Sequence, residues 1–259
     1  LLILSIMNRL VFLLLFSIVG INAQDNSKYS NEFLNIGVDA QSIGMSNAVV
    51  SNISDVNSTY WNPAGLLQLE DKQISLMHSN YFANIATYNF IAYATPIDDD
   101  SALGFSMVRF GVDDILDTTQ LIDDQGNINF DRINLFSTAD YAFLFSYARR
   151  LKFKNLNYGV NLKIIRRIIG DFSSSWGFGF DFGIQFKTNN DWNFGLMARD
   201  ITTTYNSWTI NGDKLNDIQN AIEGQNQEIP TGTEITIPKL QLGISKEIDI
   251  KNDYTLLAA

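Results

Sequence analysis

The sequence predicts an all-β protein, an antiparallel transmembrane β-barrel with a small N-terminal plug. Between residues 175 and 186, large apolar side chains alternate with glycine, acid and amide side chains. Successive side chains of a β-strand point to opposite faces, so this stretch has one apolar face and one small or polar face. A soluble sandwich would turn the apolar face inward, whereas a transmembrane barrel turns it towards lipid. The apolar members are Trp176, Phe178, Phe180, Phe182, Ile184 and Phe186.

Residues 1–23 are predicted to be a secretory signal peptide. Arg9 gives a short, positively charged start, residues 10–19 form an unbroken apolar run, and Ala23 is a small residue suited to cleavage. The run is shorter than the ~20 residues that a membrane-spanning helix needs, and no later stretch reaches that length. An uncleaved anchor is the alternative. We therefore expect an exported protein without a helical anchor.

The composition argues against several classes of function. The chain has no cysteine, which excludes disulfides and thiolate metal sites. Its formal net charge of −10 argues against nucleic acid as a partner, because phosphates attract a basic surface. His78 is the only histidine, no Gly-x-Ser-x-Gly segment accompanies it, and the acidic stretch 123–127 does not match a calcium-binding loop. We expect no enzymatic activity, no cofactor and no metal site.

Residues 24–70 are predicted to form the plug, and residues 71–259 part of the barrel. The stretch 31–69 is rich in Gly, Ala, Ser and Asn and shows no long alternation, which favours short helical turns and loops over a sheet. Nine strands are predicted after it. They are Lys72–Ser79, Ile85–Thr95, Ala102–Phe110, Ala139–Arg150, Leu156–Ile168, Ser175–Phe186, Trp192–Arg199, Lys239–Glu247 and a strand from Tyr254 onward.

The connections between these strands are sorted by length. Strand parity places the two long ones, 111–137 and 200–238, on one rim, and the short polar ones lie mostly on the other. Outer-membrane barrels have short periplasmic turns and longer outside loops. Such barrels close with an even number of strands, and here the ninth strand reaches Ala259. We therefore expect that C-terminal strands are missing from this fragment.

One local motif resembles a known family. The stretch 37–48, followed about a dozen residues later by Tyr60-Trp61-Asn62-Pro63-Ala64-Gly65, resembles the PorV/PorQ family of outer-membrane proteins of the type IX secretion system. That family is related to the FadL fatty-acid transporters, which share an Asn-Pro-Ala plug segment. A second resemblance lies at residues 199–208. The resemblance implies a FadL-like barrel whose plug motif consists of Trp61, Asn62, Pro63, Ala64 and Gly65.

Two further sets of residues are candidates for function. Charged residues in or at the ends of strands are expected on the inward face, either as a network of paired charges in the lumen or as a polar conduit. They are Asp140, Lys163, Arg166, Arg167, Asp181 and Arg199. The long loop 200–238 mixes polar chain with apolar side chains suited to binding a protein partner. These are Trp208, Ile210, Ile229, Ile235 and Ile237.

The resemblance also implies a location, partners and a role. It implies an outer-membrane protein embedded in lipid that binds the C-terminal sorting domains of secreted cargo and subunits of the type IX translocon. A FadL-like channel for hydrophobic solutes is the first alternative, and a soluble secreted β-sandwich is the second. Aromatic residues near strand ends suit an interfacial girdle. They are Tyr141, Tyr147, Tyr158, Trp176 and Trp192.

Overall fold

The computed structural model describes residues 30–122, 125–151, 156–212, 232–250 and 254–259. The predicted signal peptide, residues 1–23, lies outside the described residues. Within these residues, eleven strands form one sheet. They are β1 (Gln73–Tyr81), β2 (Ala86–Asp98), β3 (Ser101–Asp117), β4 (Asn134–Arg150), β5 (Leu156–Ile169), β6 (Ser173–Lys187), β7 (Trp192–Arg199), β8 (Thr204–Ile210), β9 (Thr233–Thr236), β10 (Lys239–Ile250) and β11 (Tyr254–Ala258).

The described helices are short, and most precede the sheet. They are η1 (Glu32–Asn35), α2 (Ala40–Gly44), α3 (Ser58–Trp61) and η2 (Pro63–Gln68), with η3 (Phe130–Arg132) in the β3–β4 connection. None of the helices among the described residues is long and apolar enough to cross a membrane.

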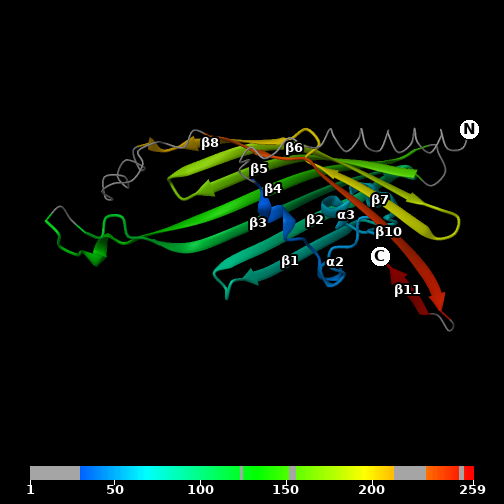
Figure 1. Ribbon diagram of the computed structural model, residues 1–259, viewed down its shortest axis with the longest axis horizontal. Helices are drawn as coiled ribbons and strands as arrows, with labels where there is room; N and C mark the ends of the chain where they lie inside the picture. The colour runs from blue at the N-terminus through cyan, green and yellow to red at the C-terminus, as the bar shows by residue number, and fades with distance from the viewer. Residues whose placement is uncertain (1–29, 123–124, 152–155, 213–231, 251–253) are drawn as a thin grey trace, which may run out of the picture.

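The sheet is an antiparallel meander, which confirms the predicted all-β class. Strands β1 to β7 each pair with the next along the chain, and β10 and β11 follow β7. Over the described residues the sheet is open, with β1 at one end and β11 at the other. Figure 1 shows the β3–β4 hairpin reaching beyond the rest of the sheet, on the same side as β8.

All nine predicted strands are present, but the two predicted long loops are partly strand. The first is shortened because β3 continues to Asp117 and β4 already begins at Asn134. The second contains β8 and β9. Strand β7 pairs with β6 only along Phe182–Lys187, and β8 pairs with Ser173–Phe178. The sequence of β8 is mostly polar, so its alternation carries no apolar signal, and pairing with the free half of β6 makes it a strand.

The two faces of β6 are occupied as the alternation predicts. Trp176, Phe178 and Phe180 are 50%, 56% and 46% exposed, whereas Asp181 and Gln185 on the other face are buried. The apolar face therefore points away from the protein. We call it the outer face, and we call the face that contacts residues 30–69 the inner face.

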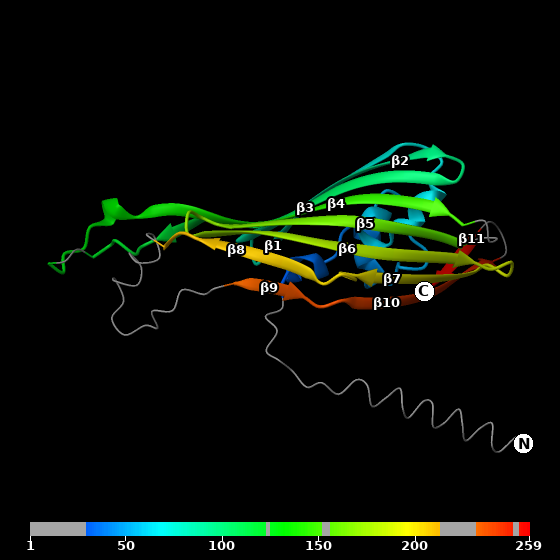
Figure 2. The same ribbon diagram turned by 90° about the horizontal axis from the view of Figure 1, so that it is seen from above.

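The segment 30–69 packs against the inner face and is called the plug. The sheet curves around its short helices (Figures 1 and 2). Its side chains and the inner residues of β2 to β5 form one hydrophobic core, in which Val38, Leu66 and Tyr88 have no exposed surface. The predicted short helical turns in this part of the chain are confirmed.

Candidate functional site at the plug and the inner face

The plug motif is fully buried between the plug and the sheet. Trp61 is 3% exposed, and its indole Nε1–H donates to the carbonyl of Val38 at 3.1 Å. Its ring stands edge-on to the ring of Tyr60, with centroids 5.0 Å apart. The indole thereby ties the end of α3 to the chain that precedes α2.

Asn62 joins the plug directly to the sheet. Its side-chain Nδ2 donates to the carbonyls of Val50 at 2.8 Å, of Ile184 at 3.1 Å and of Leu196 at 3.4 Å. The last two carbonyls belong to β6 and β7. An aliphatic residue here would leave these buried carbonyls without the donor, which costs about 1–3 kcal/mol for each unsatisfied group. An asparagine is thus needed at this position both for its hydrogen bonds to the sheet and for the turn that begins η2.

The rest of the motif begins a tight helical turn. Pro63 occupies the first position of η2, where its missing N–H costs nothing, and Asn62 Oδ1 accepts from the Ala64 N–H at 3.2 Å. A Cβ atom on Gly65 would lie 2.3 Å from the carbonyl oxygen of Ile53. Only glycine therefore allows the two plug segments to approach this closely.

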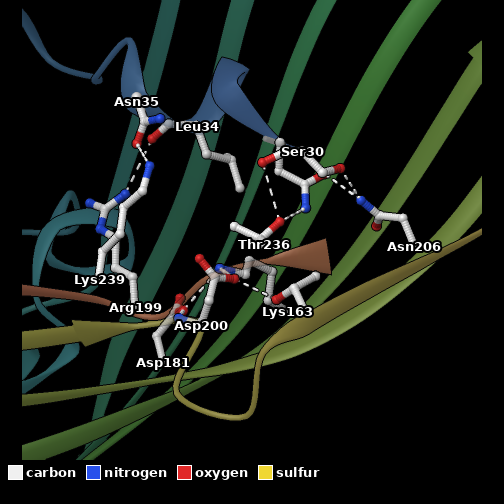
Figure 3. A network of polar contacts seen from close by, with 12 residues as sticks. Ser30, Leu34, Asn35, Lys163, Asp181, Arg199, Asp200, Asn206, Thr236 and Lys239 are labelled. Carbon is white, nitrogen blue, oxygen red and sulfur yellow. Dashed lines mark hydrogen bonds and ion pairs between the residues drawn. The ribbon is translucent and has the colours of Figure 1, made fainter. Parts of the chain in front are cut away.

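Arg199, at the end of β7, links the inner face of the sheet to the plug. Its guanidinium donates to the carbonyls of Leu34 at 3.2 Å and Tyr60 at 3.1 Å. The same group lies over the ring of Tyr60 at 4.8 Å and over that of Trp61 at 5.6 Å from the ring centroids. Figure 3 shows Arg199 directed at the Leu34–Asn35 turn. Arg199 therefore points inward, as predicted, and its side chain contacts the plug.

Lys163 is the centre of a buried ion cluster. Its Nζ lies 2.9 Å from Asp181 Oδ1 and 2.5 Å from Asp200 Oδ1, and all three side chains are at most 8% exposed. Asp181 also accepts from the Asp200 backbone N–H at 2.9 Å, and Thr204 donates to Asp200. The cluster connects β5 and β6 to the turn after β7 (Figure 3). Lys163 and Asp181 were predicted on the inward face, whereas Asp200, which follows the last residue of β7, was not.

A second cluster lies nearer the rim with the long connections. Arg167 contacts Asp140 at 2.9 Å and Glu234 of β9 at 3.0 Å. Ser30 donates to the same Glu234 at 3.0 Å, and Asn31 donates to Thr236 at 2.8 Å. The start of the plug is therefore anchored to the β8–β9 ribbon. Paired charges of this kind support a network rather than an open polar conduit.

Arg166 was predicted on the inward face, and this prediction is wrong. Its guanidinium lies 4.9 Å from the centre of the exposed Trp176 ring and donates to the Ser175 carbonyl at 3.3 Å. Lys163 and Arg167 differ from Arg166 by an odd number of positions, and both point inward. Strand parity alone therefore places Arg166 on the outer face.

The residues predicted as a partner-binding loop do not lie together. Trp208 is half-buried on the inner side of β8, with Arg167 5.2 Å from its ring centre, and Ile210 is also on that side. Ile235 is exposed on the outer face of β9, where it pairs with Tyr205. Ile229 lies outside the described residues. Among the described residues, the indole N–H of Trp208 is buried without a hydrogen-bond partner.

One plug carboxyl has a shifted acidity. Burial of Asp55 raises the pKa of its carboxyl above the ordinary 3.8, against two hydrogen bonds from Asn57 that favour the charged form. No three of the described His, Asp and Glu side chains gather in a way that could hold a metal ion. His78 is exposed and lies 2.7 Å from Asn89 on the outer face.

No protein-family model matches this chain, and no curated protein matches its sequence.

Proposed function

We propose that this protein is an outer-membrane β-barrel protein of the type IX secretion system, where it binds secreted cargo or translocon partners. The observation that carries the membrane location is the exposed apolar outer face around a filled interior. Along β6, from Trp176 to Phe186, the apolar side chains extend over about 34 Å of strand. With a strand tilt of 35–45°, this is about 26 Å, close to the ~25 Å apolar band of outer-membrane barrels.

The apolar band continues across the sheet. Neighbouring strands place eight outward side chains directly opposite one another in a single row, and every one is apolar or aromatic. They are Leu76, Ile91, Met107, Phe143, Ile164, Phe178, Tyr205 and Ile235. Soluble monomers rarely expose apolar patches of this extent. A lipid environment removes the cost of exposing them.

The role in secretion rests on the plug motif and on the form of the interior. The resemblance at Trp61–Gly65 favours the PorV/PorQ type of protein. Each motif residue is buried where the plug meets the inner face of the sheet. A plug fastened by Asn62, Arg199 and the β8–β9 ribbon favours a protein that presents surfaces to partners over one that conducts freely. The proposed binding region is the rim that carries the β3–β4 connection and the far end of the β8–β9 ribbon.

The channel alternative has one observation in its favour. A cavity of about 350 Å³ lies between the plug and the inner face of the sheet, lined in part by Phe33, Ile36 and Phe110. Such a space could receive part of an apolar molecule. Arg167 and Asp140 close one side of it, and both already belong to an ion cluster.

Two measurements on the full-length protein test the proposal. Fractionation of cells should recover it with outer membranes after carbonate extraction, and recovery as a soluble periplasmic protein would refute the membrane location. Deletion of residues 221–227 should reduce the display of cargo at the cell surface. Trp208→Ala should reduce it as well, by removing the ring that packs on Arg167 under the β8–β9 ribbon. Trp192→Ala, at the opposite rim, is the control. Normal display by both rim variants at normal abundance would favour the channel.

A further inference from the structure

A row of polar and amphipathic side chains borders the apolar band on the outer face. Each member lies directly opposite the next on the neighbouring strand, from β1 across to β9. The members are His78, Asn89, Arg109, Tyr141, Arg166, Trp176, Ser207 and Thr233. We call this set the polar row. It is two residues along each strand from the apolar row that contains Phe178.

The polar row lies on the side of the long connections. From Arg109, β3 runs on to the 118–133 connection, and from Trp176 the chain leads back to the β5–β6 turn on the same side. Barrels place longer connections outside the cell. If the protein is an outer-membrane barrel, as proposed above, the polar row lies at the headgroup level of the outer leaflet.

Two arginines in the row carry its positive charge. Arg109 donates to Thr87 at 3.0 Å and to Asp113 at 3.0 Å, and its Nε lies 3.4 Å from the Tyr141 hydroxyl. Arg166 stacks on Trp176 and donates a hydrogen bond to the Ser175 carbonyl. Among the described residues, no carboxylate forms an ion pair with Arg166. Its guanidinium is therefore a cation without a paired carboxylate at the edge of the apolar band.

The spacing of the two arginines suits a phosphate group. They stand on β3 and β5, one strand on either side of Tyr141, so their Cα atoms are about 10 Å apart. The guanidinium groups contact Thr87 and Trp176 on the outer sides of this pair, and rotation of their flexible stems would let both bind one phosphate by paired N–H donors. Tyr141 and Trp176 lie between and beside them, where aromatic rings favour the boundary of headgroup and acyl chains.

We propose that Arg109 and Arg166, with Tyr141 and Trp176, form a binding site for the phosphate of an anionic membrane lipid in the outer leaflet. This inference rests on the proposed membrane location. Asp113 neutralises part of the charge of Arg109, so Arg166 is the principal contact. The aromatic rings contact the first carbons of the acyl chains, which distinguishes a lipid from free phosphate.

The test measures which lipid lies next to Trp176. The full-length protein is reconstituted into phosphatidylcholine vesicles that contain either brominated phosphatidylglycerol or brominated phosphatidylcholine, because bromine quenches nearby tryptophan fluorescence. The chain has four tryptophans, so a Trp176→Phe variant supplies the background of the other three. The quantity compared is the ratio of quenching by the anionic lipid to quenching by the zwitterionic lipid.

We expect the wild type to prefer the anionic lipid at least fivefold, since one interfacial arginine contributes about that factor. Arg166→Gln should lower the preference about fivefold, and the double variant Arg109→Gln with Arg166→Gln should bring the ratio close to one. Arg166→Lys keeps the charge and should keep most of the preference. Arg132→Gln is the matched control, because it removes an exposed cation from the β3–β4 connection without altering the polar row.

Three outcomes would overturn the inference. One is a wild-type ratio near one, another is an unchanged ratio in the double variant, and the third is an equal loss in Arg132→Gln. Inorganic phosphate added to the vesicles should leave the ratio unchanged, and full displacement by it would assign the site to free phosphate. A wild type that neither brominated lipid quenches would refute the membrane location itself, which separates the two failures.

Discussion

A Cβ atom on Gly159 would lie 2.5 Å from the backbone carbonyl carbon of Pro63. The backbone of the sheet and the backbone of the plug are therefore in direct contact at the plug motif. The same holds at Gly195, whose Cβ would lie 2.4 Å from the carbonyl oxygen of Val50. Gly159 and Gly195 on the inner face are thus two places where the sheet contacts the plug directly.

Gly159→Ala should loosen the plug. The new methyl group cannot be accommodated by a side-chain rotation, because the atoms it meets are backbone, and overpacking of this kind costs about 1–3 kcal/mol. A cysteine placed at Ala64, which is fully buried, should react faster with a water-soluble reagent in the Gly159→Ala background. Gly44→Ala is the control, since a Cβ there meets nothing within 4 Å. Equal labelling rates with and without Gly159→Ala would contradict a direct contact between Gly159 and the plug.

Phe180→Arg should destabilise the protein in lipid by about 2–4 kcal/mol, the cost of a cation near the bilayer midplane. Phe180 faces outward near the middle of β6. Phe186→Arg, on the same face near the end of the strand, should cost about 0–1 kcal/mol because it lies near the interface. Denaturant unfolding of the vesicle-bound protein measures both. Equal costs would mean that the outer face does not span a bilayer.

Lys163→Met should be among the most damaging single changes on the inner face. It leaves Asp181 and Asp200 buried together without a cation, and loss of one partner of a buried ion pair costs about 3–5 kcal/mol. Asp200→Asn should cost less, because Lys163 keeps its contact with Asp181 at 2.9 Å. Thermal unfolding of the three proteins gives the order. A smaller loss in Lys163→Met than in Asp200→Asn would contradict this role for the cation.

Asp55 should make the plug less stable as the pH rises. Burial raises the pKa of this carboxyl above 3.8, so the folded protein holds the proton more tightly than the unfolded chain. The free energy of unfolding therefore decreases from about pH 3.8 up to the raised pKa and is constant above it. The midpoint of thermal unfolding, measured across this range, should show the decrease in the wild type and lose it in Asp55→Asn. The exposed Asp71→Asn variant should keep the wild-type slope.

The sequence alone determined the two faces of the sheet. Alternation in a strand is a local property, because each side chain points opposite to its neighbour whatever the strand pairs with. For that reason the outward rings of β6 and the nine strands with strong alternation were predictable. Arg166 was also predictable in principle, since it shares the parity of Leu162 and Ile164 on the outer face. Its charge, not its position, led to the wrong assignment.

Only the tertiary structure decided what each inner residue contacts. Strand β8 is polar and exists because β7 leaves half of β6 unpaired, which depends on register between distant segments. In the same way, Asp200 joins Lys163, and Gly159 receives Pro63, through contacts between segments far apart in the chain. The alternation and the composition of a segment describe that strand alone and carry no information on its partners. The pairing of strands and the seating of the plug depend on free energies shared between segments, and those appear only when the chain is folded.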